Sequence, residues 1–263
     1  MVTAPHPPTP RDDRPTHVAD LLRLLTRDPG RPRLTWYGDD GERVELSGAV
    51  LENWVNKTTN LLVEEFDAGP GTRVVLDLPV HWRTVVWALA AWRVGTTVVL
   101  TPADDDATLG DGTTRPDVVV TTRPDRWAGT RAELVAVALP ALARRFDGDL
   151  PAGAIDAASA VMTYGDRIGW APAVEPGLEA LSAPSSSRDH AHLVERAVGG
   201  RQLLSPTPSG DGDPAAASIL LRVLATWAGD GSVVLVSPAT ATALGSDPER
   251  FRRLVAQEQV TPA

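Results

Sequence analysis

Residues 71–102 read GTRVVLDLPVHWRTVVWALAAWRVGTTVVLTP, and this stretch decides the fold class. It opens with a β-prone run, Val74–Leu78, that ends at Pro79. Apolar residues then recur at helical spacing over Trp82–Val94, and a glycine follows them. A second short apolar run, Val98–Leu100, completes the unit. Strand, helix and strand within about 30 residues predict a crossover between two parallel strands, and therefore an α/β sheet.

The chain before this unit predicts three further elements. Thr16 caps a short helix that runs to Leu25. Leu34–Tyr37 and Arg43–Leu46 flank the turn D-D-G, which predicts a β-hairpin. Ser47 starts a long amphipathic helix. Its expected apolar face consists of Val50, Trp54, Thr58, Leu61 and Leu62.

The chain after the unit continues the alternation of strands and helices. The predicted strands are Asp117–Thr121, Gln202–Ser205 and Ser232–Val236. The predicted helices are Ala132–Phe146, Ser185–Val198, Ala215–Trp227 and Pro248–Glu258. Residues 104–114 are acidic and contain glycine, which predicts a loop. Residues 147–183 show little periodicity and receive no assignment.

Composition limits the classes of function. The 263 residues, 43% of them hydrophobic, are enough for one large domain over 15–263, after a proline-rich and charged tail over 1–14. The formal net charge of −9 disfavours nucleic acid and anionic lipid as partners. The absence of cysteine excludes disulfides and thiolate chemistry, and no run of about 18 apolar residues predicts a membrane span. We therefore expect a cytoplasmic protein without nucleic-acid or membrane partners.

The basic residues are almost all arginine. Of the 25 lysines and arginines, Lys57 is the single lysine, a bias that indicates a GC-rich, bacterial genome. Lysine is the usual side chain for a transferring phosphate and the usual amine nucleophile, so one position alone could serve either role. Because Lys57 lies in mid-helix among polar neighbours, we expect it to be exposed.

Several stretches occur in a familiar order and spacing. They are Arg43–Leu46, Gly69–Val74, Leu78–Val80, Gly95–Val99, Leu203–Pro206, Gly231–Leu235 and Pro248–Thr261. Through them the chain, from about residue 34 to its end, resembles the N-terminal subdomain of the adenylate-forming enzymes (acyl-CoA synthetases and AMP-dependent ligases). The resemblance implies an α/β fold of sheet and helix layers like the large N-terminal domain of those enzymes, without their C-terminal lid.

The phosphate-binding loop of that family has no counterpart in the sequence. The family holds the ATP phosphates with a loop of the form S-G-T-T-G-x-P-K-G, through backbone N–H groups, hydroxyls and a lysine. In family order this loop belongs between the Val118 and Leu203 strands, where neither the loop nor a lysine occurs. The later motifs for magnesium, ribose and the carboxylate are also absent from the 263 residues. The resemblance therefore implies a fold and an ancestry, and it argues against the family's reaction.

A glycine-rich stretch before the Ala215 helix is the nearest echo of that loop. The candidate cofactor-binding residues are Ser209, Gly210 and Gly212, which would contact the phosphates of ATP or AMP. Asp211 and Asp213 place two carboxylates among them, and each such contact with a phosphate at 4 Å costs about 4 kcal/mol at a surface-like dielectric. An ordinary acidic turn is the favoured interpretation, and no cofactor is expected.

Two histidine-containing stretches offer other chemistry. His190 and His192 follow Asp189 and a serine run; on the predicted helix they point about 200° apart, which defeats joint metal binding and favours a solvated surface. His81-Trp82-Arg83 lies at the carboxyl end of a strand, where ligands gather in α/β sheets. A helix start with Trp82 packed in the core is the favoured interpretation. No G-x-S-x-G, H-E-x-x-H or Walker sequence occurs, so no catalytic residue is assigned.

From these observations we expect a non-catalytic domain that binds a small molecule or a protein partner. The alternative is a residual ligase or acyl-adenylate enzyme completed by a partner subunit that supplies the lid.

Overall fold

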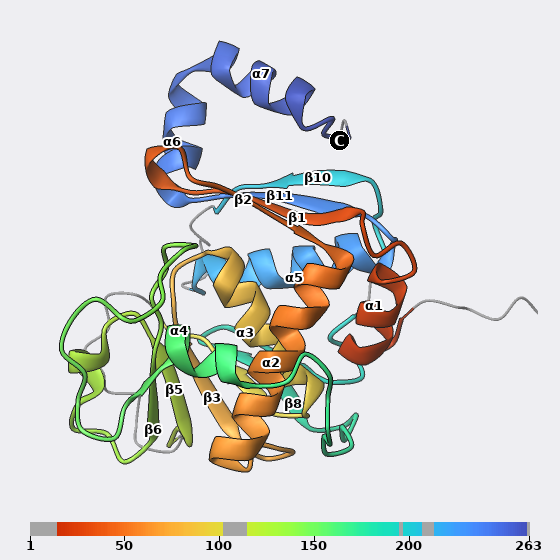
Figure 1. The fold of residues 1–263 in the computed structure, drawn as a ribbon. Coiled ribbons are helices and arrows are strands. Elements are labelled where there is room, and N and C mark those ends of the chain that lie inside the picture. The colour runs from red at the N-terminus through yellow and green to blue at the C-terminus, as the bar shows by residue number, and fades with distance from the viewer. Residues whose placement is uncertain (1–14, 102–114, 195–196, 207–212, 262–263) are drawn as a thin grey trace, which may run out of the picture.

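The computed structural model describes residues 15–101, 115–194, 197–206 and 213–261, which form two β-sheets with helices between them (Figure 1). The seven-stranded sheet has the order β7-β6-β5-β3-β4-β8-β9, and the four-stranded sheet the order β10-β11-β1-β2. The strands are β1 Pro32–Tyr37, β2 Arg43–Ser47, β3 Arg73–Asp77, β4 Thr97–Val99, β5 Val118–Thr121, β6 Glu133–Ala136, β7 Ile155–Asp156, β8 Glu179–Ala183, β9 Ser186–Asp189, β10 Arg201–Leu204 and β11 Ser232–Val236. The helices are α1 Val18–Leu25, α2 Gly48–Phe66, α3 Trp82–Arg93, α4 Ala157–Ala160, α5 Ala215–Ala228, α6 Pro238–Ser246 and α7 Pro248–Gln257. The expected tail over 1–14 and loop over 104–114 lie outside the described residues.

The predicted crossover is confirmed at the centre of the seven-stranded sheet. β3 and β4 pair in parallel, with Val74 opposite Val98, and β5 pairs in parallel on the other side of β3. The three strands are buried almost throughout, as expected for parallel strands covered on both faces.

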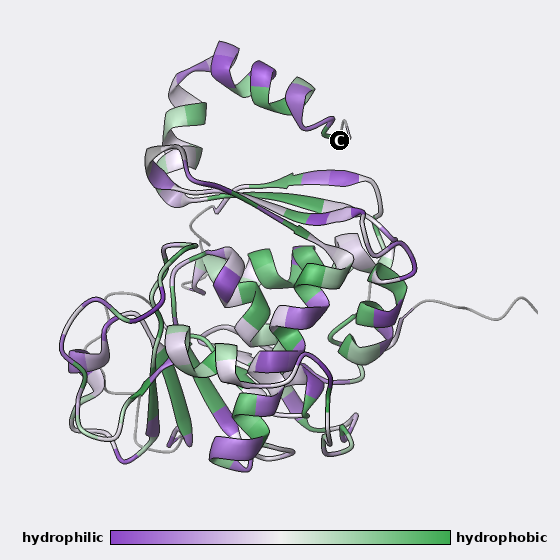
Figure 2. Cartoon of the chain, in the orientation of Figure 1, coloured by the Kyte–Doolittle hydropathy of each residue, from purple (hydrophilic) through white to green (hydrophobic). Residues whose placement is uncertain are grey.

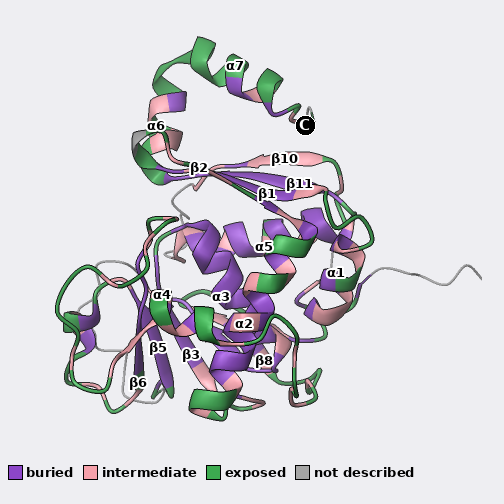
Figure 3. Ribbon diagram, in the orientation of Figure 1, coloured by how far each residue is buried: buried purple, intermediate pink, exposed green. Residues whose placement is uncertain are grey.

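Helix α3 forms the middle of the molecule. Its residues from Trp82 to Trp92 are all buried, and it contacts β3, β4, α1 and α2 (Figure 3). The side chain of His81 caps its start by accepting from the Arg83 N–H at 3.1 Å, and Gly95 follows its end with a φ of +81°. The indole N–H of Trp92 donates to the Ala180 carbonyl at 2.7 Å, so the polar group of this large buried ring is satisfied. A helix that is apolar on every side requires such complete enclosure.

The four-stranded sheet encloses the helical layer from the other side. The predicted hairpin is confirmed as β1 and β2, and β11 and β10 extend the sheet in parallel from β1. Helix α5 packs on the inner face of β10 and β11, and Figure 2 shows that much of this helix consists of hydrophobic residues. Helices α6 and α7 lie on the outer face (Figure 1). Within the described ranges, no helix combines the length and apolar character needed to cross a bilayer.

Helix α2 begins as predicted but is rotated from the expected face. Ser47 caps it by accepting from the Val50 N–H. Val50 itself is 42% exposed and Trp54 is half-buried, whereas Leu51 and Val55 are fully buried. The burial of Thr58, Leu61 and Leu62 is confirmed.

The predicted helix over 132–146 is wrong. Residues 133–136 form β6, which pairs in parallel with β5, and residues 137–146 are irregular. A short apolar run such as Leu134–Val137 fits a buried strand as well as a helix, and Pro140 cannot continue a helical hydrogen-bond pattern. Pairing with β5 therefore decides the conformation.

The predicted helix over 185–198 is also wrong, because Ser186–Asp189 forms β9, antiparallel to β8. Helix α6 had no counterpart in the prediction, although Ser237 at its cap and Pro238 at its first position are a typical helix start. The cap of α1 is His17 rather than Thr16, whose hydroxyl instead donates to Asp20.

Two glycines hold the end of α5 against residues 198–200. The Val198 N–H donates to the Ala225 carbonyl at 2.9 Å. A Cβ built on Gly229 would lie 2.2 Å from the backbone nitrogen of Gly199, which itself has a φ of +69°. Because the two backbones touch, a side chain at Gly229 requires them to separate.

We therefore expect Gly229→Ala to destabilise the fold by about 1–3 kcal/mol, the usual cost of overpacking. Gly245→Ala is the matched control, since Gly245 lies within α6 with no atom within 4 Å of its Cβ position. The control is expected to stabilise by roughly 0.5–1 kcal/mol, because alanine loses less backbone entropy in a helix. Urea unfolding of both variants measures the difference, and a Gly229→Ala chain as stable as the control would contradict the close contact.

Candidate functional site

The β8–β9 hairpin lies within the stretch between the Val118 and Leu203 strands, to which the family resemblance assigns the phosphate loop. Its two strands are joined by the two-residue turn Pro184-Ser185. Proline has no N–H, and the Ser185 N–H donates to the carboxylate of Asp213 at 2.6 Å. A phosphate cradle needs several successive N–H groups that converge on the anion. This turn offers one N–H, and a carboxylate of the chain already accepts its hydrogen bond.

Asp213 comes from the loop before α5, the acidic stretch singled out in the sequence. Its carboxylate is one of the two negative charges expected there, and the structure places it against the hairpin turn. The candidates Ser209, Gly210 and Gly212, together with Asp211, lie outside the described residues.

Lys57 points to the main chain of another segment. It is half-buried rather than exposed, and its Nζ donates to the Tyr164 carbonyl at 2.6 Å. Asn56 and Asn60, on the same helix, donate to the carbonyls of residues 165–167 at 2.8–3.0 Å. The three side chains hold an irregular segment against α2, so the lysine has a structural partner.

The predicted packing of Trp82 in the core is confirmed, and its neighbours His81 and Arg83 are buried as well. The guanidinium of Arg83 lies 4.3 Å from the ring centre of Trp82 and 5.4 Å from that of Trp54. It donates to the Leu139 and Pro140 carbonyls at 3.3 and 3.1 Å. Burial lowers the pKa of Arg83 to about 10, although the charge of Glu42 opposes the shift. The arginine therefore faces the protein interior and fixes the segment that follows β6.

A buried carboxylate fills the carboxyl end of β3. Asp77 is 5% exposed and accepts from the hydroxyl of Thr121 at 2.7 Å, from Arg123 at 2.6 Å and from the indole of Trp127 at 2.9 Å. Ligands of α/β proteins commonly bind at such strand ends. Here, however, side chains of the protein surround the carboxylate. The sequence analysis missed this cluster, although an aspartate inside a buried apolar strand was a signal for it.

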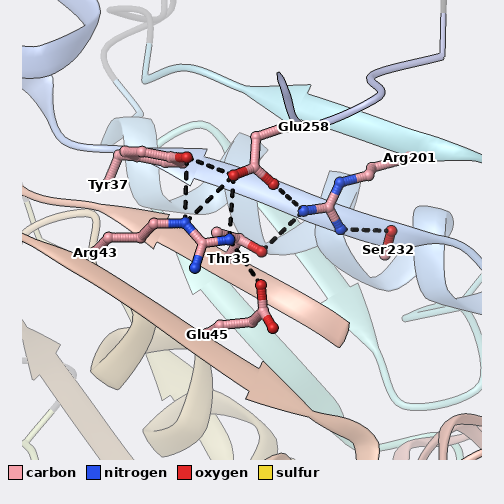
Figure 4. A network of polar contacts seen from close by, with 7 residues as sticks. All are labelled: Thr35, Tyr37, Arg43, Glu45, Arg201, Ser232 and Glu258. Atoms are coloured by element: carbon pink, nitrogen blue, oxygen red, sulfur yellow. Dashed lines mark hydrogen bonds and ion pairs between the residues drawn. The ribbon is translucent and has the colours of Figure 1, made fainter. Parts of the chain in front are cut away.

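Glu258, just after α7, ties the outer helices to the four-stranded sheet (Figure 4). Its carboxylate accepts from Tyr37 on β1, Arg43 on β2 and Arg201 on β10. Arg201 in turn donates to Ser232 on β11 at 3.2 Å. Burial favours a higher pKa for Glu258, but the hydrogen bonds from Tyr37 and Arg201 and the charge of Arg201 outweigh it, so the pKa lies below its ordinary value. The network joins all four strands, so we interpret it as a structural clamp.

The two histidines after β9 lie in different surroundings. His190 is 4% exposed, and burial lowers its pKa. The side chain of His192 is 65% exposed, and its Nδ1 lies 2.7 Å from Oδ1 of Asp189. The helix predicted for these histidines is wrong, because residues 190–194 form a bend and a turn. The described residues contain no group of histidines and carboxylates that could hold a metal ion.

A cavity of about 320 Å³ lies beside His192, between the edge strands of the two sheets. Its walls come from β10, from the second half of α5, and from Arg188, His192, Leu193 and Val198. Leucines form much of the lining, and Arg188, His192 and Arg222 supply its cationic groups. This cavity could not be predicted from the sequence, because its lining residues extend from Arg188 to Thr226 and belong to several elements.

No family model matches the chain. The sequence is 35% identical over 249 residues to a TIGR03089 family protein of Mycobacterium tuberculosis, a match that covers 92% of this chain and 95% of the relative.

Among solved structures, acetoacetyl-CoA synthetase from Streptomyces lividans matches with a TM-score of 0.68 at 19% identity over 86% of this chain. An acyl-CoA synthetase from Brucella canis has a TM-score of 0.65 at 16% identity over 88% of it. The N-terminal domain of FACL13 from M. tuberculosis has a TM-score of 0.63 at 16% identity over 93% of it. The chain spans 40%, 45% and 61% of these structures, respectively. The fold of the N-terminal part of adenylate-forming enzymes is thereby confirmed.

His81 makes the stability depend on pH. Burial, together with the charge of Arg83, lowers the pKa of His81 to about 3, against about 6.5 in an unfolded chain. Between pH 3 and pH 6.5, His81 is protonated in the unfolded chain and neutral in the folded chain. Stability is therefore lost as pH falls below about 6.5, by up to about 1.4 kcal/mol per pH unit.

His81→Asn keeps an acceptor at the helix cap and removes this titration. We expect its unfolding free energy to fall less steeply than that of the native chain between pH 6.5 and 4.5, as measured by urea unfolding. Parallel slopes for the two proteins would rule out a neutral buried His81.

Glu258→Gln tests the clamp. A carboxylate with a depressed pKa contributes stability that is present above about pH 4.3 and is lost as pH falls through its folded pKa. We expect the substitution to cost about 1–3 kcal/mol at pH 7 and progressively less in acid. The control Glu249→Gln, at a glutamate on α7 whose ion pair is exposed, should change stability by less than about 0.5 kcal/mol. Equal losses at the two positions would contradict the clamp.

Proposed function

We propose that this chain, which belongs to the TIGR03089 family, is a binding domain with the fold of the adenylate-forming enzymes that forms no adenylate itself. The observation that carries the proposal is the contact between the Ser185 N–H and Asp213 at the β8–β9 turn. A domain that activates a carboxylic acid must hold the triphosphate of ATP. The contact places the carboxylate of Asp213 at the turn, where it would repel a phosphate.

Electrostatics supports the proposal. Like charges 4 Å apart repel by about 4 kcal/mol at an effective dielectric constant near 20. A phosphate at the Ser185 N–H would have to displace Asp213 or approach it, and the net charge of −9 adds to the repulsion. A lysine normally offsets such costs, and the single lysine of the chain is engaged with the Tyr164 carbonyl.

The cavity between the sheets supports binding as the present role. Small-molecule sites are concave, largely apolar and about 300–1,000 Å³ in volume, with a few polar groups that fix orientation. The cavity fits that description at its lower limit. We therefore propose that the ligand is a small molecule rather than a protein. We also propose that the protein acts in the cytoplasm.

ATP–pyrophosphate exchange with a panel of carboxylic acids tests the absence of adenylation. The expected result is no exchange above background with any acid, while a full-length acyl-CoA synthetase in the same assay gives exchange. Turnover of any acid by the purified chain would overturn the proposal.

A partner-completed ligase is the second candidate, because the solved relatives named above are longer than the region this chain matches. It makes a different prediction in the same assay. Exchange would appear when the chain is isolated together with its partner, and would be absent from either component alone.

A further inference from the structure

An edge strand of each sheet borders the cavity, and we call this place the seam. β9 ends the seven-stranded sheet, and β10 ends the four-stranded sheet. Arg188 comes from β9, Leu204 from β10, and Leu221 and Arg222 from α5. Because each wall belongs to a different structural element, the cavity is built by the fold as a whole and not by one loop.

Its floor is apolar. Leu193 and Leu204 line it and are almost fully buried, and Leu221 is half-buried. Val198, at the margin, is 60% exposed. A hydrocarbon group in this space would remove apolar surface from water on both sides of the contact, which is favourable in proportion to the area covered.

Its rim carries two arginines, Arg188 and Arg222. Arg222 is exposed, and neither it nor Arg188 forms an ion pair within the described part of the chain. Arg188 makes a single side-chain contact there, donating to the neighbouring Ser187 carbonyl at 3.1 Å. Both arginines line the same cavity, and two guanidinium groups at one concave surface suit it to an anion.

His192 adds a third polar group to the rim. Asp189 contacts its Nδ1 at 2.7 Å and also accepts from its backbone N–H at 2.8 Å. These two contacts fix the ring, so Nε2 is the nitrogen that remains for a ligand. Arginine forks and an imidazole are suited to the oxygens of a phosphate or a carboxylate.

We propose that the seam cavity binds a small amphipathic anion, with its hydrocarbon part on the leucine floor and its phosphate or carboxylate head between Arg188, Arg222 and His192. This inference deepens the proposed binding role and rests on it. The head group is held by side chains of the rim, and the reaction of the adenylate-forming enzymes is not involved.

Isothermal titration with four six-carbon probes tests the site: hexyl phosphate, hexanoate, hexanol and hexylammonium. The expected result is binding of at least one of the two anions, with hexanol and hexylammonium at least tenfold weaker. The stronger anion identifies the head group. Because ion pairs at an exposed rim are screened, the affinity for the anion should also fall between 50 and about 500 mM salt.

Two variants and a control make the test specific. Arg222→Met and Arg188→Met each keep a long apolar side chain and should weaken the anion about tenfold or more. Arg27→Met removes an exposed arginine at the end of α1 and should leave affinity unchanged. Thermal unfolding of each variant checks that the fold is intact.

The proposal is overturned if neither anion binds at millimolar concentration, if hexanol binds as tightly as the anions, or if the two rim variants bind like the Arg27→Met control. None of these outcomes depends on pyrophosphate exchange. An exchange-active chain would refute the absence of adenylation, and a cavity that binds no anion would refute this site alone.

Discussion

The enclosure of α3 is the constraint on which the rest of the structure depends. A helix whose residues 82–92 are all buried cannot exist at a surface, so it must be covered from every side. The seven-stranded sheet covers it through β3 and β4, while α1 and α2 cover other faces. The four-stranded sheet then closes the layer through α2 and α5. An edge strand of each of these two sheets borders the cavity.

Much of this architecture could be predicted from residues 71–100, because the strand, helix and strand there are strongly patterned and close in sequence. The failures at 132–146 and 185–198 have a common physical cause. Leu134–Val137 and Ser186–Asp189 are short segments whose conformation is decided by pairing with β5 and β8, and such partners leave no local trace. The candidate site was harder still. Arg188 and Arg222 belong to different elements, and only the folded chain brings them to one cavity.

The charged side chains that bear on nucleotide binding make contacts within the protein itself. Asp213 accepts from the Ser185 N–H, Lys57 donates to a carbonyl, and Arg123 pairs with Asp77 at the end of β3. Each contact satisfies a polar group that would otherwise need water or a ligand. The chain has the fold of the N-terminal part of the adenylate-forming enzymes, while Arg188 and Arg222 line the cavity at the seam. The proposed site of binding and the β8–β9 turn are different places on one scaffold.

We propose that this chain has the fold of the adenylate-forming enzymes but does not bind ATP. Equilibrium binding of Mg·ATP to the purified chain, measured by isothermal titration at low salt, tests it most directly. The account predicts no detectable heat of binding at ATP concentrations up to about 1 mM, which corresponds to less than about 4 kcal/mol of binding free energy. Saturable binding with a micromolar dissociation constant would contradict it.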